Sequence, residues 1–134
     1  MGENNFEIRQ GAMRFFIEMM KSMDGNSFIM ESIQYLDSTN WRIREEILNL
    51  LIIRMMKEIS PNLNFEHVTG VISKLVNDEN AKVRFVAREA LATLAKNGDQ
   101  EKVMQSLGEI VVHNDFVKIV DILNNNTIVT FNEK

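Results

Sequence analysis

A pattern that recurs three times along the chain constrains its fold more than any other sequence feature. Segments 4–20, 39–55 and 79–95 align without gaps, and they read "NNFEIRQGAMRFFIEMM", "TNWRIREEILNLLIIRM" and "ENAKVRFVAREALATLA". In each segment an asparagine, a variable residue, a charged residue and a β-branched residue precede an arginine. These arginines are Arg9, Arg44 and Arg84, which recur at nearly regular intervals. Internal similarity at such a period is typical of stacked helical hairpins.

Apolar residues follow each arginine at helical spacing. The third position after the arginine is Ala12, Ile47 or Ala87, and the seventh is Phe16, Leu51 or Leu91. Steps of three and four positions place these side chains on one face of an α-helix. Each copy of the repeat therefore predicts a long amphipathic helix with one face directed to a core.

Shorter helices are predicted between the copies of the repeat from their capping residues. Asn26 or Ser27 would cap a helix over 26–36, and Asn64 would cap one that follows Ser60-Pro61. Gly98 would end the third long helix and Asp99 would cap the next, with a final helix over 113–123. We therefore predict an all-α fold of about three helical hairpins in a single domain, residues 1–123, with 124–134 as a C-terminal tail.

The composition excludes several classes of function. The chain has no cysteine, two isolated histidines and no glycine-rich phosphate loop, so we expect no metal, no cofactor and no enzyme activity. Its net charge of −4 makes it a poor general nucleic-acid binder. Charged residues interrupt the apolar runs, which predicts no membrane span and no membrane binding. The lack of cysteine suits a cytoplasmic protein.

The third copy of the repeat resembles a HEAT repeat. In HEAT repeats the second helix commonly follows an Asp and contains a Val-Arg pair, as Asp78 and Val83-Arg84 do in "NDENAKVR". The resemblance implies a right-handed HEAT-repeat or armadillo-like α-solenoid. It also implies that Arg9, Arg44 and Arg84 are structural arginines, which bind neighbouring loops and keep the repeats in register. The first copy has no preceding helix in this chain, so the domain is expected to be incomplete.

A more specific resemblance lies in the second copy. The stretch "STNWRIREEILNLLI" resembles the loop and helix of TOG domains, the tubulin-binding HEAT arrays of microtubule regulators, and most closely those of the CLASP and crescerin groups. The chain would match the C-terminal half of such a domain. The resemblance implies tubulin as the partner and a cytoskeletal location, at a microtubule, cilium or centrosome. Its implied contact residues lie in two loops and comprise Asn40, Trp41, Arg42, Asn80 and Lys82.

Two alternatives remain open from the sequence. Trp41 is either a hydrophobic staple that folds onto its own helix or an exposed binding residue beside Arg42. A full TOG domain is longer than this chain, and its first-half loops supply an important part of the tubulin contact. The alternative to tubulin binding is therefore a HEAT-repeat scaffold. Such a scaffold would bind a different protein or self-associate through its open N-terminal end.

Overall fold

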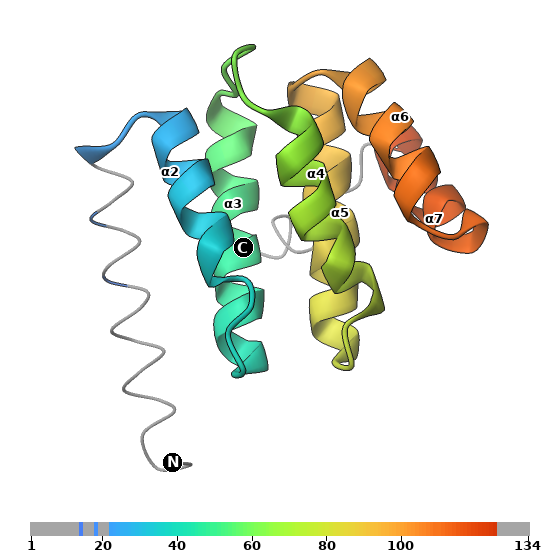
Figure 1. Ribbon diagram of the computed structural model, residues 1–134, viewed down its shortest axis with the longest axis horizontal. Coiled ribbons are helices and arrows are strands. Elements are labelled where there is room, and N and C mark those ends of the chain that lie inside the picture. Colours follow the sequence, from blue (N-terminus) through green and yellow to red (C-terminus); the bar gives the residue numbers. More distant parts are fainter. Residues whose placement is uncertain (1–13, 15–17, 19–21, 126–134) are drawn as a thin grey trace.

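The computed structural model describes Arg14, Glu18 and residues 22–125 (Figure 1). The first copy of the repeat, with Phe6, Glu7 and Arg9, lies almost wholly outside the described residues. Over the described residues the protein is all-α, as predicted. Its α-helices are α2 (Gly25–Ser32), α3 (Trp41–Lys57), α4 (Phe65–Ser73), α5 (Ala81–Asn97), α6 (Gln100–Ile110) and α7 (His113–Asn125). Two 3₁₀ helices, η2 (Ile33–Tyr35) and η3 (Lys74–Asn77), extend α2 and α4.

The helices form two layers, which Figure 1 shows one in front of the other. The front layer contains α2, α4 and α6, and the rear layer contains α3, α5 and α7. Within the rear layer α5 packs against both α3 and α7, and within the front layer α4 packs against α6. The chain alternates between the two layers, so α2 and α3 form one helical hairpin, α4 and α5 the next, and α6 and α7 the last. The loops inside the first two hairpins are equivalent and lie along one edge of the molecule.

The core lies between the layers, and α5 is its centre. Among the described residues, the repeat positions that the apolar spacing predicted are all buried: Ile47 and Leu51 in α3, and Ala87 and Leu91 in α5. Ten residues of α5 are buried, and several of them are alanines. Small side chains allow neighbouring helices to approach closely, which a helix flanked by two partners in its layer requires. The inward faces of α3 and α5 therefore follow from the repeat itself.

Most of the predicted helix ends are confirmed, but the predicted start of α2 and the predicted end of α7 differ from the structure. Asn64 caps α4, Asp99 caps α6, and Gly98 follows the last residue of α5. The cap of α2 is Asp24 rather than Asn26 or Ser27: its side chain accepts a 2.9 Å hydrogen bond from the Ser27 backbone N–H. The Asp24 carboxylate satisfies a free backbone N–H earlier in the chain than Asn26 or Ser27 could as caps, so the helix begins at Gly25. The last helix continues past its predicted end at Leu123, to Asn125.

Two further properties concern membrane and metal binding. No helix in the described part of the chain is long and apolar enough to cross a membrane. The same residues contain no group of three or more His, Cys, Asp or Glu side chains placed to hold a metal ion.

Candidate protein-binding edge

Two equivalent loops define one edge of the molecule, where the front-layer helices turn into the rear-layer helices. The loops end at Asn40 and Asn80, whose side chains cap α3 and α5. The Asn40 amide oxygen accepts from the Arg42 backbone N–H at 3.0 Å, and the Asn80 oxygen accepts from that of Lys82 at 2.8 Å. Each asparagine amide NH₂ group has no hydrogen-bond partner among the described residues, so it stays available as a donor.

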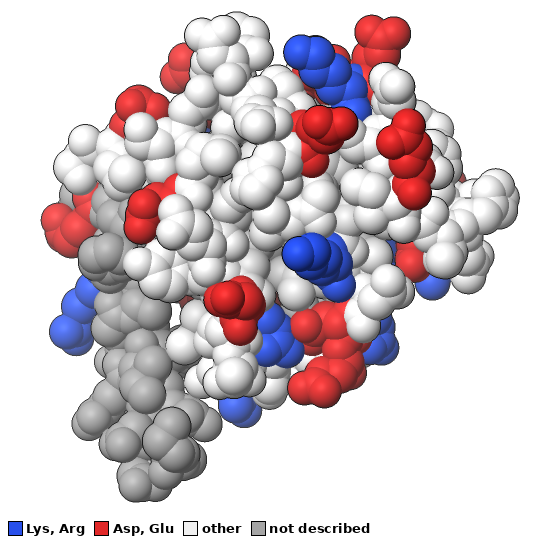
Figure 2. All heavy atoms as spheres, in the orientation of Figure 1, with Lys and Arg blue, Asp and Glu red and all other residues white. Residues whose placement is uncertain are grey.

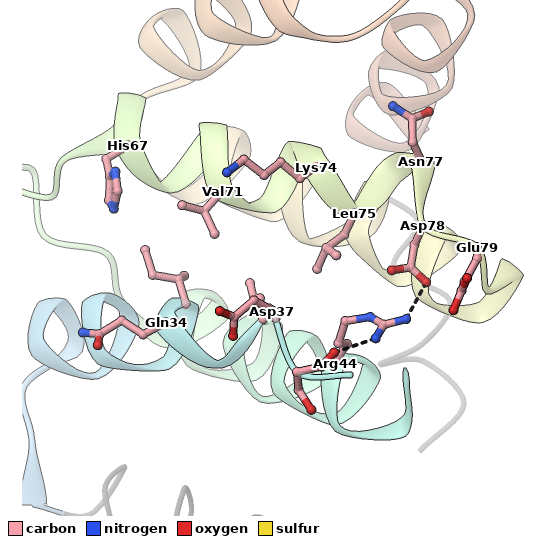
Figure 3. Close-up of a pocket in the computed structure, with 13 residues that line it drawn as sticks. Gln34, Asp37, Arg44, His67, Val71, Lys74, Leu75, Asn77, Asp78 and Glu79 are labelled. Carbon is pink, nitrogen blue, oxygen red and sulfur yellow. Dashed lines mark hydrogen bonds and ion pairs between the residues drawn. The ribbon is translucent and has the colours of Figure 1, made fainter. Parts of the chain in front are cut away.

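Arg44 joins the two loops through a buried ion pair (Figure 3). Its Nη1 donates to the Ser38 carbonyl at 2.6 Å, and its Nη2 donates to Asp78 Oδ2 at 2.9 Å. The two side chains are only 8% and 9% exposed, so the pair is protected from solvent screening. Arg44 thus contacts its own loop and that of the next hairpin.

Arg84 makes the corresponding bond within its own loop. Its Nη1 donates to the Asp78 carbonyl at 2.6 Å, as Arg44 does to Ser38, so the bond recurs in successive copies of the repeat. Asp78 Oδ2 also accepts from the Asn80 backbone N–H at 3.0 Å. The guanidinium groups of Arg44 and Arg84 are therefore both bonded to loops of the chain itself.

The ring of Trp41 lies beside two cations from different helices. The guanidinium carbon of Arg42 is 4.6 Å from the ring centroid, and Lys82 Nζ is 5.7 Å from it. Trp41 is half-buried and packs against the core, whereas Arg42 and Lys82 are exposed. The structure thus brings three of the five expected contact residues into one group. Trp41 also packs partly against the core. It therefore combines features of the two sequence interpretations, the hydrophobic staple and the exposed binding residue.

A groove of about 800 Å³ opens beside this edge, between the front-layer helices of two hairpins. In Figure 3, His67, Val71 and Lys74 lie along one wall, and Gln34 and Asp37 lie along the other. The sequence did not reveal this groove, because its two walls come from different hairpins and depend on how those hairpins pack. On the face in Figure 2 acidic and basic side chains are interspersed rather than gathered into one basic field.

Comparison with known proteins gives a distant but consistent similarity. The chain is 25% identical over 97 residues to TOG array regulator of axonemal microtubules protein 1 of human, and equally to that of mouse. It is 26% identical over 106 residues to crescerin-like protein che-12 of Caenorhabditis elegans. These matches cover 72% to 78% of this chain but only 6% to 8% of the relatives.

The similarity confirms the resemblance to TOG-containing proteins of the crescerin group that the Asn-Trp-Arg stretch indicated. No known family profile matches the chain. No solved structure matches it either. The chain is therefore similar to a small part of long proteins whose names refer to TOG arrays and axonemal microtubules.

Proposed function

We propose that this chain is a non-catalytic protein-interaction module, a TOG-like HEAT-repeat solenoid that binds tubulin through its loop edge. One combined observation carries the proposal: a chain similar to named microtubule regulators holds Arg42 and Lys82 together on the ring of Trp41. The alternation of front-layer and rear-layer helices supports the HEAT-repeat solenoid. A location at microtubules of the cytoplasm or cilium follows from the same proposal.

The proposed contact is electrostatic and hydrogen-bonded. Arg42 and Lys82 are exposed cations, and tubulin presents a strongly acidic surface, so the two surfaces attract despite the chain's net charge of −4. The amide NH₂ groups of Asn40 and Asn80 add donors along the same edge. Arg44 and Arg84 take no direct part, because their guanidinium groups bind the loops.

Charge reversal at the edge tests this function. We expect Arg42→Glu or Lys82→Glu to weaken binding to tubulin dimers by at least about tenfold, or about 1.4 kcal/mol, because each replaces an attraction by a repulsion. Binding is measured by analytical ultracentrifugation with and without tubulin. The run without tubulin also reports any self-association of the chain.

Lys96→Glu is the matched control. Lys96 is an exposed lysine in the last turn of α5, at the opposite end of that helix from Lys82, and its reversal changes the net charge equally. We expect it to leave tubulin binding close to that of the unmodified chain. Equal losses from all three substitutions, or no binding by the unmodified chain, would contradict the proposal.

A further inference from the structure

The group formed by Trp41, Arg42 and Lys82 joins two hairpins. Arg42 follows Trp41 on α3, whereas Lys82 is the second residue of α5, in the next copy of the repeat. Both cations lie within the distance at which an aromatic ring attracts a positive charge, at 4.6 and 5.7 Å from the centroid. The ring is thus a shared contact for two exposed charges that the sequence separates.

Neither cation is paired with a carboxylate of the described residues. This distinguishes them from Arg44, which pairs with Asp78, and from Lys102, which approaches Asp99 at 3.9 Å. Two like charges held near one ring repel each other, and a pair of carboxylates placed between them would relieve that repulsion. The group therefore presents two positive charges, and a ligand with two or more carboxylates could pair with both.

The burial of Trp41 makes the group a pre-organised one. Trp41 packs against the core cluster with only part of its side chain exposed, so its ring is held in place. Free Arg and Lys side chains lose much rotamer entropy when a ligand immobilises them. A ring that already restricts both side chains reduces this cost, since part of the ordering has occurred before the ligand binds.

We propose that Trp41 is a positioning residue, which holds Arg42 and Lys82 as one two-cation site for neighbouring carboxylates of an acidic protein segment. The inference rests on the proposed function for the identity of that protein, but its carboxylate chemistry is tested separately. Trp41 then acts through the two cations, rather than as the exposed contact that the resemblance implied.

The chain's single tryptophan makes the test selective, because its intrinsic fluorescence reports this site alone. The probe is a hexaglutamate peptide, with hexaglutamine as the uncharged control. We expect hexaglutamate to change the Trp41 fluorescence and hexaglutamine to leave it unchanged. Arg42→Gln and Lys82→Gln should each weaken hexaglutamate binding, and raising the salt concentration should weaken it further.

Substitutions of Trp41 separate positioning from packing. NMR of the Lys82 side chain is measured in the free protein, where the Trp41 ring should shift its ε-methylene protons upfield. Trp41→Leu preserves apolar packing and should abolish this shift, while Trp41→Phe should retain part of it. Trp41→Leu should also weaken hexaglutamate binding about two- to fivefold for each cation released, the range of an exposed cation–π contact. Because substituting Trp41 removes the fluorophore, hexaglutamate binding to these variants and to the unmodified chain is compared by NMR titration. Circular dichroism checks that the variants fold.

The outcomes are distinguishable. If Trp41→Leu binds hexaglutamate as the unmodified chain does, or if the Lys82 shift is the same in all variants, the positioning role is overturned. If Trp41→Leu fails to fold, Trp41→Phe decides: an unchanged shift and affinity overturn the role, and intermediate values support it. If the chain binds hexaglutamate as expected but not tubulin, the proposed function fails and the positioning role stands.

Discussion

Asp78 is the residue on which the contact between the two loops depends most. Its carboxylate accepts from Arg44 of the preceding hairpin and from the Asn80 backbone N–H, while its carbonyl accepts from Arg84. In the equivalent loop Ser38 replaces it: the Ser38 hydroxyl accepts from Asn40, and its carbonyl accepts from Arg44. A serine can thus serve one loop, but only a carboxylate can also neutralise an arginine from the neighbouring hairpin.

Asp78→Asn should therefore destabilise the protein strongly. The substitution preserves size and leaves the Arg44 charge buried without a counterion, which costs about 3–5 kcal/mol in comparable sites. Urea denaturation followed by circular dichroism measures the change. Asp37→Asn is the matched control, since Asp37 is exposed beside the same groove, and we expect a change within about 0.5 kcal/mol. Similar values for both substitutions would contradict the importance of the ion pair.

Gly98 is required by a close approach rather than by its backbone angles. A Cβ atom there would lie 2.4 Å from Phe65 Cε1 and 2.6 Å from the Leu94 carbonyl oxygen. Gly98→Ala should therefore destabilise the protein by about 1–3 kcal/mol through overpacking. Gly108→Ala is the control, because that helical glycine has no neighbour within 4 Å, and it should stabilise by up to about 1 kcal/mol. Thermal unfolding compares them, and a neutral Gly98→Ala would refute the steric account.

At the scale of single elements, capping decides where each helix begins. Caps are read well from the sequence because the capping side chain and the N–H groups it satisfies are close neighbours along the chain. Asn64 and Asp99 were found in this way. The start of α2 was misplaced because Asp24, Asn26 and Ser27 are all capping residues, and their order along the chain does not reveal which one is used.

The cap of α2 should make that helix sensitive to acid. The hydrogen bonds that Asp24 accepts from Ser27 hold the pKa of its carboxyl below the ordinary value of 3.8. A lowered folded pKa means that the cap stabilises α2 fully above about pH 3.8, and that this contribution is lost as the pH falls through the lower folded value. Asp24→Ala should show no such loss. Its stability is compared with that of the unmodified chain between about pH 2 and pH 6; a difference that does not shrink in acid would contradict the cap.

At the scale of the whole molecule, the packing of α3 against α5 creates the proposed binding edge. Both helices begin at equivalent positions of the repeat, so stacking them brings the start of one beside the start of the other. Trp41 and Lys82 meet for this reason, although they belong to different copies of the repeat and lie far apart in the sequence. Arg42→Glu and Lys82→Glu change different hairpins, so a loss of tubulin binding from each would show that the two loops act as one surface.

The sequence by itself determined the all-α fold, the inner faces of α3 and α5 and most of the helix starts. These features depend on interactions between residues close together in the chain. The spacing of apolar residues and the position of capping residues therefore predict them. The tertiary structure alone decided that Arg42 and Lys82 share the ring of Trp41, that Asp78 serves two hairpins, and that a groove opens between the front-layer helices of those hairpins. Contacts between successive copies of the repeat depend on the distance and angle at which whole helices pack, and no local pattern contains that information.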